Sequence, residues 1–531
     1  DPAGNNNAAA TDFTWVYDTS VPTVSSIAVT DVTSGQYGND ATYTVIVTAS
    51  EALEDAPTLT LEGGSVGSGT GSGGSSTTIW TYTFTPTSAD QAVTIDVAAG
   101  AITDAAGNDN TAAATQFAFT HDRTVPTSAI TVTDVTSGQY GNDATYVVIV
   151  TASEALENQP TLTLAGGSVG SGTGSGGSST TIWTYTFTPT SADQAVTINV
   201  AAGAITDAAG NDNTATPTQF AFTHDRTAPT ATITSTEVST GGSLNEAVTF
   251  TVTFNEEMTG IADGDFTVSG ATCVLSDYTV ATANTIFTQI CTPDTNGELT
   301  TLSVGVVGTD PAGNNNAAAT DFTFTYDTTV PTVVITSGDV STGGSHNGAT
   351  TMIFTFSEEM TGIADGDFTF TNCAAGTFSV ETANTVFHQV CTPSTDGATV
   401  TVAVAASRGT DPAGNNNAVA TDFTFTYDTT APTVSSITFA DTELKAGETS
   451  LVTIVFSEAV AAFANADLTI VNGAMTAVST ANSGVTWTST YTPTADLEDD
   501  TNVLIVADSY TDLAGNAASA GLTSGNYEVD T

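Results

Sequence analysis

Basic residues are scarce in this sequence. Lysine and arginine number 4 in total, against 57 aspartates and glutamates, so the formal net charge is -53. Such a chain cannot neutralise phosphates, which excludes nucleic-acid binding, and anionic membrane surfaces repel it for the same reason. The partners that its surface favours are cations, because cations screen or bridge the repulsion between carboxylates.

Long apolar runs and helical periodicity are missing as well. No stretch is apolar over the length that a membrane-spanning helix needs, and no leader peptide or anchor is visible. Because residue 1 falls in the middle of a repeat, we expect such parts to lie outside this segment. The histidines form no arrangement with serine or acidic residues that is typical of a hydrolase or a metalloprotease. We therefore expect no enzyme.

Cysteine is rare, and its few residues are regularly placed. They form two pairs with the same separation, Cys273/Cys291 and Cys373/Cys391. Buried free thiols are one explanation, but equal spacing in two successive repeats favours a disulfide within each repeat and an oxidising compartment. Aligning IWTYTFTP (79–86) with IFTQICTP (286–293) places Cys291 where Phe84 stands, at an inward-facing position. The expected disulfides are structural.

Repetition is the most abundant feature of the chain. A D-x-A-G-N turn recurs roughly every hundred residues, beginning at Asp1, Asp104, Asp207, Asp310, Asp411 and Asp512. A proline-stiffened exit recurs with it, as DTSVPT at Asp18, DRTVPT at Asp122, DRTAPT at Asp225, DTTVPT at Asp327 and DTTAPT at Asp428. A period of this length corresponds to a whole domain.

The repeat divides the chain into a short leading segment and five domains. The segment 1–19 corresponds to the last strand of a truncated preceding domain, or to a donated strand. The predicted domains are domain 1 (20–122), domain 2 (123–226), domain 3 (227–327), domain 4 (328–429) and domain 5 (430–531).

Within each domain, apolar residues alternate with polar ones. Over 248–254 valine and phenylalanine alternate with threonine, and the same period of two recurs over 80–84, 400–404 and 423–427. This pattern indicates strands with one buried face and one solvated face. About seven such strands per hundred residues, separated by Gly, Asn and Asp, are typical of a two-sheet antiparallel sandwich. The predicted fold class is all-β, a tandem array of antiparallel β-sandwich domains.

These motifs resemble the bacterial Ig-like repeats of large surface adhesins and biofilm-associated proteins. The resemblance covers essentially the whole chain and rests on F-S-E-E (356–359), A-D-G-D-F (364–368), Y-T-P-T (491–494), the T-D-x-A-G-N turns and the D-T-T-A-P-T joints. It implies Ig-like domains in extracellular, non-enzymatic rods, often rigidified by Ca²⁺ at the joints between domains. Ig-like modules of bacterial and archaeal surface layers are similar too, so the architecture of the parent protein stays open.

The order of strands predicts that acidic loops gather at one pole of each domain. In a seven-stranded sandwich, the second-to-third, fourth-to-fifth and sixth-to-seventh loops lie at the pole where the chain enters. The D-x-A-G-N turn is the sixth-to-seventh loop, and a glutamate opens the second-to-third loop. Because the last aspartate of the preceding domain arrives at the same pole, side-chain oxygens of two successive domains should meet at each joint.

The candidate metal ligands at these joints are acidic residues and asparagines. In domains 3 to 5 they are Asp225, Glu256, Glu257, Asp263, Asp265, Asp310 and Asn314; Asp327, Glu358, Glu359, Asp365, Asp367, Asp411 and Asn415; and Asp428, Glu458, Asp467, Asp512 and Asn516. Domains 1 and 2 offer Asp18, Glu51, Asp104 and Asn108, and Asp122, Glu154, Asp207 and Asn211. Hard oxygens without histidine or thiolate suit Ca²⁺ better than zinc. The alternative is that these residues only shape turns.

The sequence as a whole predicts a stiff, acidic, extracellular array that serves as a stalk or scaffold at a cell surface. Its expected partners are Ca²⁺ and, through parts outside this segment, an unknown surface ligand. One alternative is a subunit of a surface layer or filament, in which copies assemble by lateral contacts or by strand donation from 12–18. Another is a glycan-binding module in domain 5, for which Trp487 would need to be exposed.

Overall fold

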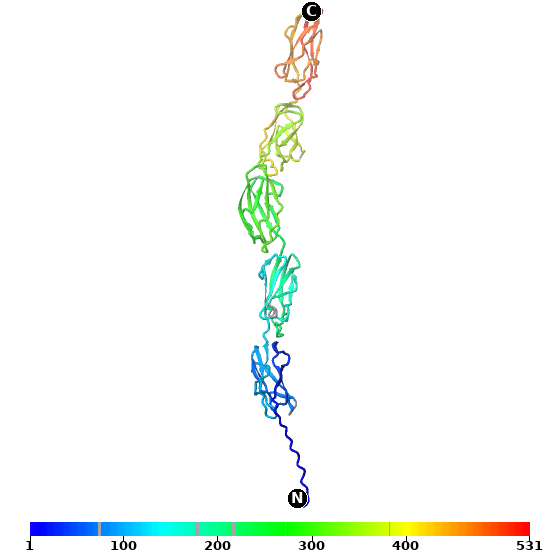
Figure 1. The fold of residues 1–531 in the computed structure, drawn as a ribbon. Helices are drawn as coiled ribbons and strands as arrows, with labels where there is room; N and C mark the ends of the chain where they lie inside the picture. The colour runs from blue at the N-terminus through cyan, green and yellow to red at the C-terminus, as the bar shows by residue number, and fades with distance from the viewer. Residues whose placement is uncertain (73–75, 176–179, 215–218, 271, 382) are drawn as a thin grey trace. The chain divides into compact units, whose positions relative to one another are not determined.

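The computed structural model describes residues 1–531 except 73–75, 176–179, 215–218, 271 and 382. By its contacts the chain divides into two compact units, each described by itself. Unit 1 comprises Asp1–Pro229, Glu256–Ile261 and Val306–Ala317, and unit 2 comprises Thr230–Asn255, Ala262–Gly305 and Ala318–Thr531. Each domain is built from one continuous run of chain, so each takes up one band of the colour scale in Figure 1.

Domains 1 and 2, in unit 1, are sandwiches of two sheets with the same topology. In domain 1 one sheet has the order β1 (Val24–Val29), β3 (Tyr43–Ala49), β7 (Ile79–Pro86) and β5 (Gly64–Val66), with β6 (Thr70–Ser72) also paired to β7; the other has the order β2 (Tyr37–Gly38), β9 (Phe117–Asp122), β8 (Asp90–Asp96) and β4 (Thr60–Glu62). The sheets of domain 2 are β10 (Ser128–Val132), β12 (Tyr146–Ala152), β16 (Ile182–Pro189), β14 (Gly167–Val169) and β15 (Thr173–Ser175), and β11 (Tyr140–Gly141), β18 (Phe220–Asp225), β17 (Asp193–Val200) and β13 (Leu162–Ala165).

Domains 3 and 4, whose strands lie in unit 2, have a longer edge strand in the first sheet. The sheets of domain 3 are β19 (Ala231–Ser235), β21 (Val248–Phe254), β24 (Ile286–Pro293) and β23 (Cys273–Thr282), and β20 (Gly242–Leu244), β26 (Phe322–Tyr326), β25 (Leu299–Val304) and β22 (Phe266–Ser269). Those of domain 4 are β27 (Val333–Ser337), β29 (Thr350–Phe356), β32 (Val386–Pro393) and β31 (Cys373–Val380), and β28 (Ser345–His346), β34 (Phe423–Tyr427), β33 (Thr399–Val404) and β30 (Phe368–Thr371).

Domain 5, also in unit 2, keeps the first sheet and divides the second into smaller pieces. Its first sheet contains β35 (Val434–Phe439), β37 (Ser450–Phe456), β42 (Thr486–Pro493), β40 (Gly473–Met475) and β41 (Ser479–Thr480). The pieces are β36 (Glu443–Lys445), β47 (Tyr527–Asp530) and β43 (Glu498–Asn502); β39 (Leu468–Ile470), β44 (Leu504–Val506) and β46 (Leu522–Thr523); and β38 (Val460–Ala461) with β45 (Thr511–Asp512). A 3-10 helix, η3, covers Asn465–Asp467. No helix in the described ranges is long and apolar enough to cross a membrane.

The cores form where the inward residues of the two sheets meet. Along β21 every second residue from Val248 to Phe254 is buried, while the threonines between them are partly exposed. β3 and β29 show the same alternation. This is the period of two that the sequence shows, and the all-β sandwich that it predicts is confirmed. Trp487 in domain 5 is half-buried, and its indole Nε1 donates to the Gly484 carbonyl at 2.8 Å.

One strand pair in each domain departs from the antiparallel expectation. The short second strand pairs in parallel with the last strand, as β2 does with β9, and the same holds for β11/β18, β20/β26, β28/β34 and β36/β47. The short strand continues the course of the first strand toward the pole where the domain ends, and the last strand runs to that same pole.

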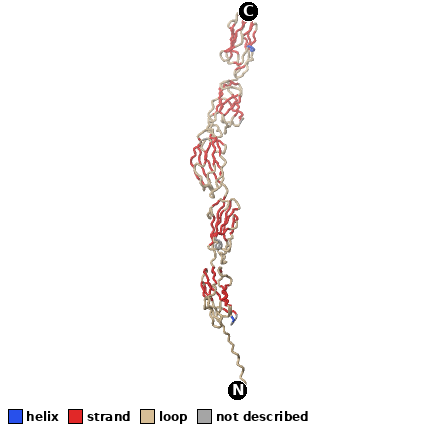
Figure 2. The backbone as a smooth tube through the Cα atoms, in the orientation of Figure 1, coloured by secondary structure: helices blue, strands red, loops and turns tan. Residues whose placement is uncertain are grey.

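The leading segment pairs with no sheet in this structure. Residues 5–23 contain no strand (Figure 2), and Phe13, Trp15 and Tyr17 are 89%, 70% and 78% exposed. A single alternating strand cannot satisfy its backbone hydrogen bonds or cover its aromatic face alone. The assignment of 12–18 as a sheet strand therefore stays a prediction.

Candidate metal-binding joints

Each domain carries an aspartate that its own turn holds in place. In domain 1 this is Asp104, which is 2% exposed and whose Oδ1 accepts the backbone N–H groups of Ala106 and Asn108 at 2.8 and 2.9 Å. Gly107 closes the turn with φ +88°, a conformation that favours glycine. The Asn108 side chain donates to Asp104 Oδ2 at 2.8 Å, and this bond, with the backbone donors, lowers the pKa of Asp104. The turn of domain 1 thus holds the buried Asp104 carboxylate in its ionised form.

The asparagine of the same turn also binds the incoming linker. Asn108 Nδ2 donates to the backbone carbonyl of Asp18 at 3.3 Å. The equivalent bonds in domains 2 to 5 are Asn211–Asp122 at 3.0 Å, Asn314–Asp225 at 2.9 Å, Asn415–Asp327 at 2.7 Å and Asn516–Asp428 at 2.9 Å. Each linker is therefore fastened to the domain that it enters.

Carboxylates from both sides of each linker meet beside these turns. A linker aspartate, a glutamate that follows a central strand of the first sheet, and the turn aspartate each offer an oxygen, and these oxygens lie within 4.8 Å of one another. We number the five acidic clusters along the chain: Asp18/Glu51/Asp104, Asp122/Glu154/Asp207, Asp225/Glu256/Asp310, Asp327/Glu358/Asp411 and Asp428/Glu458/Asp512. All of these residues are among the candidate ligands indicated by the sequence, and the loop order explains why they meet.

Other acidic residues that the sequence grouped with these ligands have local roles instead. Their carboxylates cap the loop before the next strand: Asp265 accepts from Ala262 N, Asp367 from Ala364 N, and Asp467 from Ala464 N and Ser509 Oγ. Asp263 and Asp365 accept from the amides of Gln289 and Gln389. These five carboxylates are not among the oxygens that lie within 4.8 Å of one another at the joints, so their expected part in metal binding stays a prediction.

The side-chain oxygens of the turn asparagines accept hydrogen bonds in this structure, and their expected part in metal binding stays a prediction. The Nδ2 group of each turn asparagine donates to the turn aspartate and to the linker carbonyl. In domains 2 to 5 its Oδ1 atom accepts a hydrogen bond from an asparagine of the preceding domain. The amide bridges are Asn39–Asn211 at 3.3 Å, Asn142–Asn314 at 3.3 Å, Asn245–Asn415 at 3.0 Å and Asn347–Asn516 at 3.1 Å. The bridging asparagines of the preceding domains were not identified from the sequence, although each stands at the end of the short second strand.

Asp90 holds the linker between domains 1 and 2 to domain 1, and this contact was also missed by sequence reasoning. Its Oδ1 accepts the backbone N–H groups of Arg123 and Thr124 at 3.2 Å each, and its Oδ2 accepts the Thr124 hydroxyl. Asp193 and Asp396 hold the later linkers in the same way. We call these residues the linker tethers.

In domain 3 the linker tether is the neutral residue Asn296. Its Oδ1 accepts the Thr328 N–H at 2.6 Å, and its Nδ2 donates to the Thr329 hydroxyl at 2.9 Å. Because a neutral amide serves there, the common role of this position is hydrogen bonding to the linker. A signal was present in the sequence, since an Asp or Asn follows the T-P pair in every domain.

The clusters crowd negative charge into partly buried space. The pKa of Glu154 is raised to about 7, first by burial and then by the charges of Asp122 and Asp207. Burial and neighbouring carboxylates also raise the pKa values of Glu358 and Glu458. Each cluster is therefore a place where a proton or a cation relieves repulsion.

The donor set of the clusters fits a hard cation. Every candidate ligand atom is a carboxylate oxygen, and neither histidine nor thiolate takes part. Ca²⁺ prefers such oxygens, accepts irregular geometry, and completes its shell with backbone carbonyls and water. The three carboxylates of each cluster are the residues that would hold it.

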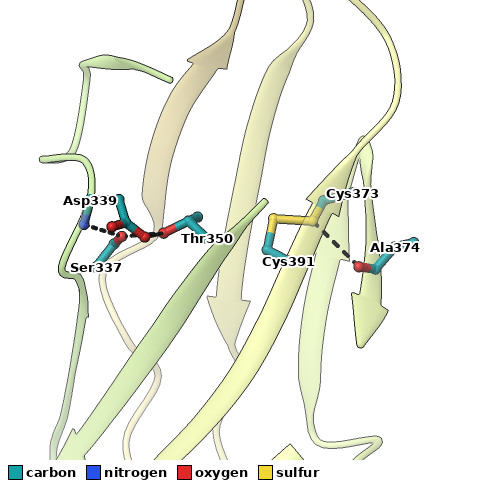
Figure 3. Close-up of a disulfide and its surroundings, with 6 residues drawn as sticks. All are labelled: Ser337, Asp339, Thr350, Cys373, Ala374 and Cys391. Carbon is teal, nitrogen blue, oxygen red and sulfur yellow. Dashed lines mark hydrogen bonds between the residues drawn. A yellow bond between two sulfur atoms is a disulfide. The ribbon is translucent and has the colours of Figure 1, made fainter. Parts of the chain in front are cut away.

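The cysteines lie away from the joints and form two disulfides. Cys273 is bonded to Cys291 and Cys373 to Cys391, and Cys291 and Cys391 are fully buried. Figure 3 shows the Cys373–Cys391 bond across neighbouring strands β31 and β32, apart from the hydrogen-bonded group of Ser337, Asp339 and Thr350. Each disulfide fastens the edge strand of a first sheet to its inner neighbour.

Comparison with protein families yields one match that recurs along the chain. The family described as "Bacterial Ig-like domain" matches residues 18–121, 122–223, 225–326, 327–427 and 428–529. None of the curated proteins compared matches the chain.

Several solved structures are similar to the chain at low identity. The extracellular region of plexin A4 is 11% identical with a TM-score of 0.17; the match covers 90% of this chain, which spans only 48% of that region. A marsupial T cell receptor is 10% identical with a TM-score of 0.20, covering 57% of this chain and 100% of the receptor chain. The BSP domain of a biofilm associated protein is 9% identical with a TM-score of 0.17, covering 80% and 100%.

Proposed function

Because the chain belongs to the bacterial Ig-like domain family, we propose that it is a non-enzymatic structural segment of a bacterial cell-surface adhesin. In this role it is an extracellular stalk or scaffold whose domains are 20–122, 123–226, 227–327, 328–429 and 430–531. The observation that carries the proposal is that one set of contacts recurs at five linkers. At each of them three carboxylates lie close together, and a turn asparagine donates a hydrogen bond to the backbone carbonyl of the linker aspartate. A recurring joint serves spacing and orientation along a chain.

Direct contacts restrain each joint between domains before any cation binds. The linker tether holds the start of the linker, as Asp90 does through Arg123 and Thr124. The turn asparagine holds the linker carbonyl, and the amide bridge ties the two domains to each other. Proline follows within a few residues and restricts the backbone further. These contacts support a stiff array of domains.

Ca²⁺ bound at the clusters supplies the positive charge that offsets the repulsion between successive domains. In cluster 2 the ligands are Asp122 from the linker and Glu154 and Asp207 from domain 2. Asp207, buried and held in place by its turn, orients the site, while Glu154 gives up the proton that its raised pKa favours. Cation binding and joint stiffness are therefore linked, and removal of Ca²⁺ loosens the array.

A calcium titration of the full chain tests this proposal directly. The variant Asp411→Asn removes a cluster 4 ligand and is expected to lower the number of bound ions by one. Asp365→Asn is the matched control, because Asp365 lies in the same domain but accepts a hydrogen bond from Gln389 instead. If Asp365→Asn loses a site and Asp411→Asn does not, the clusters are not the cation sites.

Scattering with Ca²⁺ and then with chelator should show a change in the maximum dimension of the chain. An unchanged scattering profile contradicts stiffening of the joints by the ion.

A second proposal is a filament or surface-layer subunit that assembles through the leading segment. The supporting observation is the row of exposed aromatic side chains at Phe13, Trp15 and Tyr17. In this role residues 12–18 pair with a sheet edge of a neighbouring copy. A chain that starts at Pro22 should then remain monomeric where residues 1–531 associate. Equal association of the two chains contradicts strand donation.

A further inference from the structure

The asparagines that precede a glycine in this chain are Asn296, Asn347 and Asn472. An asparagine before glycine is chemically labile, because the next backbone nitrogen can attack the side-chain carbonyl carbon and glycine has no Cβ in the way. The reaction requires that nitrogen to leave its hydrogen bond and approach the side chain. In the structure, the three sites differ in how firmly the glycine is held by its surroundings.

The glycines after Asn296 and Asn472 are held in place. Gly297 N donates to the Tyr326 carbonyl at 2.8 Å. Gly473 begins β40, opposite Pro493, with its Cα packed against the ring of Tyr491. Both glycines would have to break native contacts before they could react.

Gly348 is less restrained than the other two glycines. It lies between β28 and β29, outside both strands. Within the described part of the chain no hydrogen bond engages its N–H group. The side chain of Asn347 keeps one strong contact, from its Nδ2 to Asn516 Oδ1.

We propose that Asn347–Gly348 is a spontaneous deamidation site that alters the joint between domains 4 and 5. The Gly348 nitrogen loses its proton and bonds to Cγ of Asn347, and Nδ2 leaves as ammonia. Water then opens the cyclic imide to aspartate or isoaspartate. The step needs water alone and no oxidant, reductant or cofactor.

The product is incompatible with the amide bridge at this joint. Asn347 Nδ2 donates to Asn516 Oδ1 at 3.1 Å, whereas a carboxylate has no hydrogen to donate and faces another acceptor. Asn516 cannot turn its amide around, because its Nδ2 already serves Asp512 Oδ2 at 2.7 Å and the Asp428 carbonyl at 2.9 Å. Deamidation therefore removes the bridge and adds a negative charge beside cluster 5.

The other amide bridges lack this sensitivity. The bridging residues Asn39, Asn142 and Asn245 are followed by Asp40, Asp143 and Glu246. The side chains of these following residues obstruct the attack of their own backbone nitrogens on the asparagine side chain. Among the amide bridges in the described part of the chain, the one between domains 4 and 5 is therefore the bridge that is exposed to this reaction.

Peptide mass spectrometry of the full chain, incubated in mildly alkaline buffer, tests the site. We expect the peptide with Asn347 to show the exchange of NH₂ for OH before the peptides with Asn296 and Asn472. Gly348→Ala is the control, because a Cβ there meets only His346 Nε2, at an ordinary 3.7 Å. It should suppress the change at Asn347 and leave the other two peptides unaffected. Earlier modification of Asn296 or Asn472, or an unchanged rate in Gly348→Ala, overturns the proposal.

The consequence for the joint is tested with Asn347→Asp in the full chain. Genetically encoded fluorophores at the exposed positions Val419 and Leu451, in domains 4 and 5, report their separation by energy transfer. We expect a broader distance distribution in Asn347→Asp than in the unmodified chain. Asn245→Asp changes a bridge at another joint and should leave this distribution unchanged. Identical distributions for Asn347→Asp and the unmodified chain contradict the loss of the bridge.

Discussion

The backbone of Gly64 on β5 lies against the ring of Phe84 on β7, so closely that a Cβ atom would stand 2.2 Å from Phe84 Cζ. Gly64 pairs with Pro86 just as Cys273 pairs with Pro293, and Phe84 corresponds to Cys291. The same place in every domain, between an edge strand and its inner neighbour, is filled either by an aromatic ring over a glycine or by a disulfide. Domains 2 and 5 use Gly167 with Phe187 and Gly473 with Tyr491; domain 4 uses Cys373 with Cys391.

Gly64→Ala is expected to destabilise domain 1 by about 1–3 kcal/mol, because the new methyl group overpacks a filled core. Gly67→Ala in the same domain is the control, since a Cβ there meets nothing within 4 Å. Calorimetry of the full chain should show a transition moved to lower temperature for the first variant alone. Equal shifts for both variants would mean that the ring does not restrict this position.

Reduction of the disulfides is expected to destabilise domains 3 and 4 by about 2–4 kcal/mol each, because the unfolded chain regains the conformational entropy that the crosslink removes. Domains 1, 2 and 5 contain no cysteine and should be unaffected. Hydrogen exchange with and without a reductant can resolve the domains. Faster exchange in β23 and β31, with no change in β5 and β14, is the expected pattern; a uniform change contradicts it.

Domains 1 and 2 should lose stability in mild acid. His121 is buried, and its Nδ1 contacts the Tyr43 hydroxyl at 2.8 Å. Burial lowers the pKa of His121, so the unfolded chain takes up a proton at a pH where the folded domain does not. This contribution to stability is present above the ordinary histidine pKa of 6.5 and is lost as the pH falls through the lower folded value.

Melting curves over a pH series check this dependence. The substitutions His121→Gln and His224→Gln should reduce it, since both histidines have the same surroundings. Domains 3 and 4 provide an internal comparison, because Tyr326 and Tyr427 occupy the equivalent positions. A similar acid sensitivity of all domains would show that the buried histidines do not cause it.

Asp90→Ala should expose the linker between domains 1 and 2 to trypsin. Arg123 lies in that linker, and its backbone N–H is bound by Asp90. Cleavage after Arg123 is expected to rise several-fold, while cleavage after Arg226 in the next linker, held by Asp193, serves as the reference within the same molecule. Asp90→Asn should behave like the unmodified chain, because Asn296 performs this role in domain 3. Equal cleavage in all variants contradicts the tether.

Glu154→Gln should have opposite effects with and without divalent cations. The raised pKa of Glu154, about 7 against an ordinary 4.5, means that its stabilising contribution is present at low pH and is lost as the pH rises through the folded value. In chelator above that pH, the neutral side chain should raise the melting temperature of domain 2. With Ca²⁺ the same variant should lose a ligand and the stabilisation that the ion provides. A change of the same sign in both conditions would falsify the cation role of cluster 2.

The sequence by itself determined the repeat, the all-β class and the residues of the five acidic clusters. Alternation along segments such as 248–254 depends only on the geometry of a strand, in which successive side chains face opposite ways. The D-x-A-G-N turn likewise arises from neighbours in the chain, as Asp104 and Asn108 show. Local patterns of this kind are legible without coordinates.

Only the tertiary structure decided which polar groups bind one another across long separations. Asn39 and Asn211 meet although they are 172 residues apart, and no local pattern distinguishes them from turn-forming asparagines. Gln389, brought next to Asp365 by folding, donates a hydrogen bond to its carboxylate, and no local pattern in the sequence indicates this contact. The direction of a loop carboxylate depends on which donors the packed sheets place within reach, and that is a property of the fold.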